Sequence, residues 1–215
     1  MKKLILNFKS KEIKNIKTSK NYLGGKGANL SQMGKMGLPV PPGFTISTKV
    51  CEIFYNNRRK LSSKIIKSIR KELEKIETET KKKFGDLTNP LLVSVRSGAR
   101  VSMPGMMDTI LNLGLNDKTV LALAKKTSNN RFAKDSYRRF IQMYSNVVLG
   151  IENYYFEDLI ENYKLTKGVL LDTELDAEDW DGLIKDFKSI VKEKTKKDFP
   201  QDVYHQLIGA VSAVF

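Results

Sequence analysis

The feature that constrains the fold most is a change of hydrophobic pattern near residue 112 of this 215-residue chain. Before that point, short apolar runs alternate with turn residues, as in Leu38-Pro39-Val40-Pro41-Pro42-Gly43, which is typical of short strands and tight connections. After it, aromatic and aliphatic residues recur with helical spacing over 130–149, 153–164 and 176–191. The sequence therefore predicts an α+β fold whose second half is mostly helical.

We expect two lobes from this change. A small α/β lobe covers residues 1–112 and is rejoined by 198–215, and a helical lobe over 113–197 is inserted between those parts. The chain is 40% hydrophobic, which is enough for a sizeable core. No window is apolar and long enough to span a bilayer, and the single Cys51 excludes an internal disulfide. A cytoplasmic protein without a membrane partner is the expectation.

One candidate site is the glycine-rich segment Leu23-Gly24-Gly25-Lys26-Gly27. It opens a helical run that Gly37 ends, and a helix N-terminus favours anions through its backbone N–H groups and dipole. The Walker pattern is absent, because Gly27 rather than Ser or Thr follows Lys26. By spacing alone, a tight turn beside a surface lysine is the more common explanation of such a segment.

A second candidate site follows Leu91-Leu92-Val93-Ser94-Val95, which reads as a short buried strand. Next come Arg96-Ser97-Gly98-Ala99-Arg100, where two guanidinium groups offer planar donor forks that suit phosphate oxygens. The methionines of Met103-Pro104-Gly105-Met106-Met107 then suggest a soft apolar wall for a flat ring. The simpler alternative is a strand, a turn and core methionines.

The formal net charge is +14, which raises a nucleic-acid-binding module as an alternative function. The cations are mostly lysine, 30 against 8 arginines, and they are spread over helical segments among glutamates. We therefore interpret most of the charge as a solvated surface and expect no nucleic-acid partner.

The segments 23–48 (LGGKGANLSQMGKMGLPVPPGFTIST) and 91–117 (LLVSVRSGARVSMPGMMDTILNLGLND) together resemble the N-terminal nucleotide-binding domain of pyruvate, phosphate dikinase. The related phosphoenolpyruvate synthases share the Gly-Gly-Lys and Val-Arg-Ser cores. Those enzymes continue with an acidic segment where this chain has Ser97-Gly98-Ala99-Arg100, so the dikinase is favoured. A phosphoenolpyruvate synthase fragment remains the alternative within the same chemistry.

The resemblance implies an ATP-grasp-like domain in which Lys26 and Arg96 contact the phosphates of ATP and act in catalysis. It places Gly105, Met107 and Thr109 at the nucleotide. The implied reaction converts ATP, phosphate and pyruvate to AMP, diphosphate and phosphoenolpyruvate through a phosphohistidine in another domain, and the implied assembly is a homodimer.

The same resemblance implies that essential parts lie outside this chain. The acidic ligands of Mg²⁺ and the phosphocarrier histidine are expected beyond residue 215, and His205 lacks the phosphocarrier context. The last predicted helix stays apolar up to Phe215, so we expect a truncated chain or an interrupted gene. The chain alone is expected to lack dikinase turnover, and an interaction domain left by gene decay is a further alternative.

Overall fold

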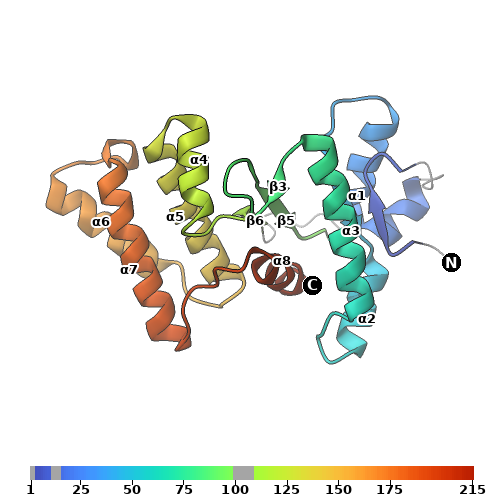
Figure 1. Cartoon of the computed structure of the whole chain (residues 1–215). Coiled ribbons are helices and arrows are strands. Elements are labelled where there is room, and N and C mark those ends of the chain that lie inside the picture. Colours follow the sequence, from blue (N-terminus) through green and yellow to red (C-terminus); the bar gives the residue numbers. More distant parts are fainter. Residues whose placement is uncertain (1–2, 11–15, 99–108) are drawn as a thin grey trace. The chain divides into compact units, whose positions relative to one another are not determined.

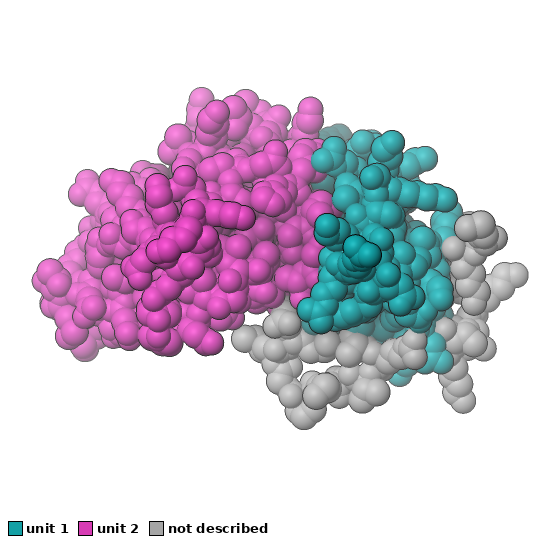
Figure 2. Space-filling model, turned by 90° about the horizontal axis from the view of Figure 1, so that it is seen from below, with its two compact units in different colours: residues 1–81, 96–107, 215 teal, residues 82–95, 108–214 magenta. Residues whose placement is uncertain are grey.

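The computed structural model describes residues 3–10, 16–98 and 109–215 (Figure 1). The chain divides into two compact units, which Figure 2 colours separately. The first unit contains residues 1–81, 96–107 and 215, and the second contains residues 82–95 and 108–214. Helices and small sheets are mixed along the chain, as the predicted α+β class requires.

The first unit consists of a two-stranded antiparallel sheet with three helices. Strands β1 and β2 pair in a register that joins Ile5 to Ile46 and Asn7 to Phe44. Helix α3 buries Ile65 and Ile69 on its apolar stripe, and Ser62 caps its N-terminus by accepting a hydrogen bond from the Ile65 N–H. The bounds are β1 Ile5–Asn7, α1 Ile16–Lys35, β2 Phe44–Ile46, α2 Thr48–Asn56 and α3 Ser63–Thr80.

The second unit combines two small sheets with a group of helices. Strands β3 and β4 pair in parallel, β5 pairs with β6, and Arg96, the last residue of β5, clusters with the first unit. The bounds are β3 Lys83–Phe84, β4 Pro90–Leu91, β5 Val93–Arg96, β6 Thr109–Leu113, α4 Thr119–Thr127, α5 Asn130–Val147, α6 Tyr154–Lys167, the 3₁₀ helix η1 Asp172–Glu174, α7 Ala177–Thr195 and α8 Val203–Ala213.

Aromatic side chains build the core of the second unit. Phe140, Tyr144 and Phe199 form a mutual edge-to-face cluster with ring centroids 5.6–5.7 Å apart. Trp180 on α7 is fully buried, and α5 packs directly on α7. Such ring pairs contribute about 0.5–1.5 kcal/mol each beyond the area that they bury, so they stabilise this unit from within.

A reciprocal side-chain cap begins α7. The Asp176 carboxylate accepts hydrogen bonds from the Glu178 and Asp179 N–H groups at 2.8 and 3.1 Å. The Asp179 side chain in turn accepts from the Asp176 N–H at 2.8 Å, which completes a reciprocal capping box. Local sequence thus sets this helix boundary without help from the core.

The predicted buried strand at Leu91–Val95 is wrong in its details. Two strands, β4 and β5, flank Leu92, and Val93 and Val95 are only half-buried. Strands β4 and β5 each belong to a two-stranded sheet and pair with only one other strand. Neither is therefore covered on both faces, as a central strand of a larger sheet would be. Helix α3 ends at Thr80, because Lys81 adopts the left-handed conformation with φ 54°.

The compact units do not coincide with the predicted lobes. Residues 82–95 and 108–112 join the helical unit because Ile110 and Leu113 are fully buried in its aromatic core. The last helix, α8, also packs there through Ala210, instead of rejoining an α/β lobe. The lobe division of the nucleotide-binding fold therefore stays a prediction.

We predict that Phe140→Ala destabilises the second unit by about 3–5 kcal/mol, because it leaves a cavity in a core that cannot collapse easily. Urea unfolding followed by the fluorescence of Trp180, the single tryptophan of the chain, reports on this unit. The control is Leu165→Ala, since Leu165 is 75% exposed and its loss should shift the free energy of unfolding by no more than about 0.5 kcal/mol. Equal shifts for both variants would contradict the packing described.

Candidate functional site

The glycine-rich segment lies inside α1 at a break in the helix. Gly24 has φ 70° and ψ 172°, so α1 consists of two helical segments joined at this residue. This region of backbone space is essentially restricted to glycine. A new helical segment therefore begins at Gly25, and Lys26 is exposed in its first turn. The predicted helix start is confirmed, although helical structure also precedes it from Ile16.

Close packing holds this break against the small sheet. A Cβ atom placed on Gly27 would lie only 2.7 Å from the Thr45 side chain on β2, so glycine is required for the approach. On the other side of the break, the Thr48 hydroxyl donates a hydrogen bond of 2.8 Å to the Asn21 carbonyl. Leu23 is buried with Leu6 of β1. The segment is thus fixed from both sides of Gly24.

The arginine motif meets this break within the first unit. Arg96 is exposed at the end of β5, and the chain then runs through Ser97 to Gly98. A Cβ atom placed on Gly98 would lie 3.9 Å from the Leu23 carbonyl oxygen, one residue before the break. The structure therefore brings the main chains of the two predicted motifs together, although 70 residues separate Lys26 from Arg96 in the sequence.

Ser97 is a polar residue that the sequence analysis did not single out. The residue is 9% exposed, and its hydroxyl oxygen is buried without a hydrogen-bond partner among the described residues. Thr45, which sets the close approach of Gly27, was missed as well. Spacing along the sequence carries no signal for either residue, because both roles arise from contacts between segments.

The placement of the remaining predicted site residues at the glycine-rich segment stays a prediction. Gly105 and Met107 lie outside the described residues. Thr109 is half-buried at the first position of β6, which belongs to the second unit. His205 is exposed on α8, away from any cluster of metal-ligating side chains, since the described part of the chain contains no group of three or more such residues.

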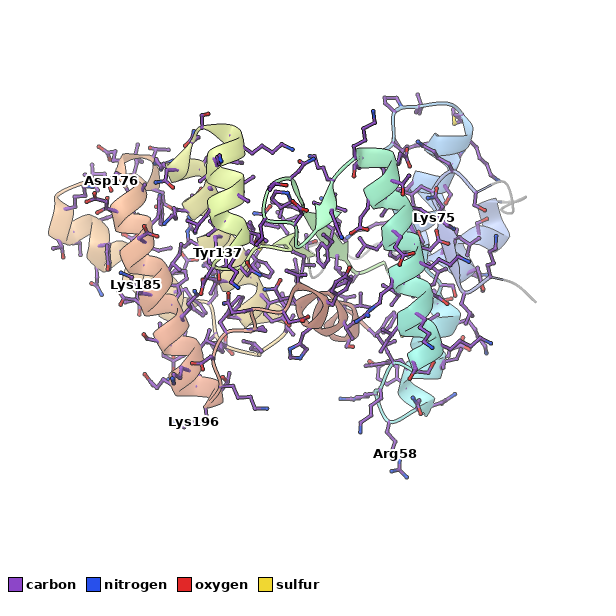
Figure 3. All side chains as sticks on the ribbon, in the orientation of Figure 1. Arg58, Lys75, Tyr137, Asp176, Lys185 and Lys196 are labelled. Atoms are coloured by element: carbon purple, nitrogen blue, oxygen red, sulfur yellow. The ribbon has the colours of Figure 1, made fainter. Side chains whose placement is uncertain are left out.

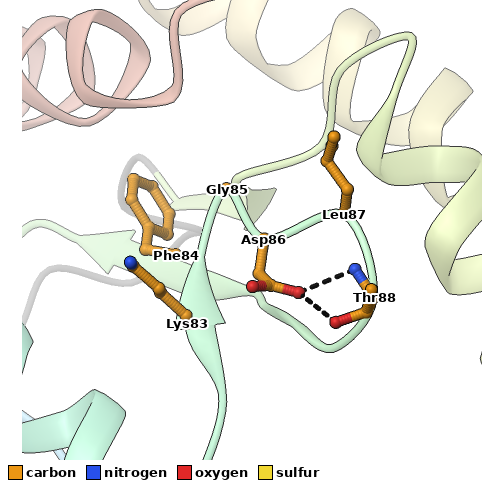
Figure 4. A pocket seen from close by; sticks show the side chains of 6 residues that line it. All are labelled: Lys83, Phe84, Gly85, Asp86, Leu87 and Thr88. Carbon is orange, nitrogen blue, oxygen red and sulfur yellow. Dashed lines mark hydrogen bonds between the residues drawn. The ribbon is translucent and has the colours of Figure 1, made fainter.

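A hollow of about 320 Å³ lies elsewhere, over the turn that connects β3 and β4 (Figure 4). The Asp86 carboxylate accepts hydrogen bonds from the Thr88 hydroxyl at 2.6 Å and from the Thr88 and Asn89 N–H groups at 2.7 Å. These bonds, the Thr88 hydroxyl first, lower the pKa of Asp86 to about 2. The Asp86 carboxylate therefore stabilises the turn. Because it already accepts these hydrogen bonds, we assign no chemical role to the hollow.

Comparison with known proteins gives a consistent result. The sequence model of the family described as "Pyruvate phosphate dikinase, AMP/ATP-binding domain" matches residues 20–66 and 58–143. Proteins named pyruvate, phosphate dikinase from Entamoeba histolytica and Clostridium symbiosum are 52% and 53% identical over 92% and 91% of the chain. The dikinase of Rhizobium meliloti is 46% identical over the whole chain.

The chain spans 22–24% of the length of these three relatives. No helix in the described residues is long and apolar enough to cross a membrane. The family match runs from residue 20 to 143, which is 124 of 215 residues, and includes both Lys26 and Arg96. The chain therefore belongs to the AMP/ATP-binding domain family of pyruvate, phosphate dikinase.

Proposed function

We propose that the chain binds the phosphates of ATP at the break in α1, as the nucleotide-binding portion of a dikinase. The observation that carries the proposal is the approach of Gly98 to the Leu23 carbonyl, which joins the arginine motif to the glycine-rich segment. The family match to an AMP/ATP-binding domain supplies the ligand class. The phosphoenolpyruvate synthase alternative is not favoured, because the relatives carry the dikinase name.

The local backbone supports a common direction for the two cations. In an extended chain, side chains two residues apart point to the same face. Gly98 turns its Cβ position toward Leu23, so an extended run from Arg96 to Gly98 would send the Arg96 side chain to the same side. Lys26 projects from the helical turn that follows, within the same unit. Both cations could then reach one triphosphate.

The two cations would act differently on that triphosphate. The Arg96 guanidinium would hold two phosphate oxygens as a planar fork, whereas the Lys26 ammonium would follow the moving charge as a mobile point charge. The helix that starts at Gly25 would add the positive end of its dipole and its first N–H groups. Phosphoryl transfer needs this arrangement, because catalysis is mostly positioning and stabilisation of charge on oxygen.

The full reaction proposed is the dikinase reaction, in which ATP, phosphate and pyruvate give AMP, diphosphate and phosphoenolpyruvate through a phosphohistidine outside this chain. The proposal includes an ATP-grasp-like architecture, with Gly105, Met107 and Thr109 near the nucleotide and the helical lobe over 113–197. A cytoplasmic homodimer is likewise proposed for the complete enzyme. The identity of the relatives over most of this chain supports these steps.

Mg²⁺ is expected in such an enzyme, but the described residues do not fit a site for it. They contain no group of three or more His, Cys, Asp or Glu side chains that could hold an ion. We therefore assign no step in this chain to the metal. Its ligands and the phosphocarrier histidine would come from the remainder of a longer protein, and the chain by itself is proposed to have no turnover.

We predict that Arg96→Ala weakens binding of a non-hydrolysable ATP analogue to this chain roughly 10–150-fold. One charge-assisted hydrogen bond contributes about 1.5–3 kcal/mol. Isothermal titration calorimetry measures the dissociation constant, and Lys26→Ala should lower affinity in the same direction. The matched control is Arg58→Ala, which removes an exposed arginine outside the proposed site. Equal affinity for the Arg96 and Arg58 variants would refute the assignment.

We also predict that Gly24→Ala lowers both stability and nucleotide affinity. Its φ of 70° and ψ of 172° would strain any residue with a Cβ by about 1–3 kcal/mol, and relief of the strain would displace Lys26. Thermal unfolding and calorimetry measure the two effects. The control is Gly150→Ala at φ 70°, where a new Cβ meets no atom within 4 Å and nucleotide affinity should stay unchanged. A Gly24 variant with normal affinity would rule out this role.

A further inference from the structure

Half of the net charge of the chain comes from one short segment. Residues 53–71 contain seven cations, Arg58, Arg59, Lys60, Lys64, Lys67, Arg70 and Lys71, and no Asp or Glu. The segment therefore carries +7 of the total of +14. The segment contains no acidic residue of its own, so the charge of this stretch of sequence is of one sign.

The structure puts these cations on one exposed surface. Helix α3 turns Ile65 and Ile69 into the core of the first unit and leaves Lys64, Lys67 and Lys71 on its exposed side. Positions 64, 67 and 71 follow one side of a helix over about 10 Å. None of the three lysines forms an ion pair with a described residue. With Ser63 and Ser68 they line a shallow hollow of about 370 Å³.

The loop before α3 carries three further exposed cations. Arg58, Arg59 and Lys60 are all exposed, and the Arg58 side chain points away from the ribbon in Figure 3. Arg58 and Arg59 adopt left-handed backbone conformations with φ 53° and 55°, which are costly for residues that carry a Cβ. We call the six residues Arg58, Arg59, Lys60, Lys64, Lys67 and Lys71 the basic face.

Helix stability does not explain this placement of charge. The first turn of α3 contains no acidic residue, and cations near a helix N-terminus oppose the helix dipole. Like charges at spacings of three and four residues add further repulsion. The acidic residues of α3 begin only at Glu72, so none lies in the first turn, where acidic residues stabilise a helix most. A negatively charged ligand would offset each of these unfavourable terms.

We propose that the basic face binds the sugar–phosphate backbone of nucleic acid without regard to sequence. Exposed ion pairs contribute little individually, so only a partner with many closely spaced charges gains affinity, through the release of its counterions. A chain pI of about 9.7 with lysines and arginines gathered along one helix is the electrostatic pattern of such proteins. Helix α3 itself contains no aromatic residue for stacking bases, and this favours contact with the backbone.

This proposal departs from the expectation of no nucleic-acid partner. That expectation took the lysines to be interleaved with glutamate, which residues 53–71 contradict. The basic face consists of residues other than Lys26 and Arg96, so the proposal does not depend on nucleotide binding. An acidic protein is the competing partner, and a polyglutamate titration distinguishes it from nucleic acid.

The test is fluorescence anisotropy of a labelled DNA duplex of about 20 base pairs, titrated with the chain at several NaCl concentrations between about 50 and 200 mM. The triple variant Lys64→Gln/Lys67→Gln/Lys71→Gln should bind at least about tenfold more weakly at the lowest salt. Its log–log salt slope should fall by about 0.9 for each phosphate that a lysine no longer neutralises, and so by up to about 2.7. Gln keeps a high helix propensity, so α3 should remain folded.

The matched control is Lys118→Gln/Lys125→Gln/Lys185→Gln, which removes three exposed lysines from the second unit and the same total charge. It should change affinity no more than about twofold. Equal weakening by both triple variants would show that the charge acts diffusely and would overturn the proposal. A polyglutamate of equal charge that binds as tightly as the duplex would overturn it too, in favour of an acidic protein partner.

Discussion

The candidate site depends on the backbone at Gly24. Its conformation, with φ 70° and ψ 172°, interrupts α1 and starts a second helical segment that carries Lys26 in its first turn. Only glycine adopts that conformation without strain, and Gly27 must then lack a side chain to approach Thr45. The Leu23 carbonyl beside the break is also the point that Gly98 reaches. One residue thus determines where a cation, a helix start and the arginine motif meet.

The second unit obtains its stability independently of that site. Its aromatic cluster brings together α5, α7 and the segment around Phe199, and the buried Arg138 guanidinium stacks 4.5 Å above the Trp180 ring. Desolvation in this position lowers the pKa of Arg138, and the ion pair with Asp135 opposes that effect. The buried Arg138 cation is tolerated because Asp135 balances its charge and the Trp180 ring presents an aromatic face to it. The proposed phosphate site in the first unit takes no part in these contacts.

The sequence predicted what local chemistry controls. The aromatic stripe of α5 and the glycine start before Ala28 both follow from spacing along the chain, and both are confirmed. The sequence did not predict the features that depend on contacts between distant segments. The burial of Ile110 in the helical unit depends on packing that no periodicity reveals. The meeting of Gly98 with Leu23 belongs to the same class, as does the buried Ser97 hydroxyl.

The central claim is that triphosphate binds at the break in α1. The most direct measurement is a titration of the ¹⁵N-labelled chain with a non-hydrolysable ATP analogue, followed through backbone amide resonances. Our account predicts that the signals of Gly25, Lys26, Gly27 and Arg96 shift together with one dissociation constant, because a bound phosphate would lie beside all of them. Resonances of these residues that stay in place, while those of α3 move, would contradict it.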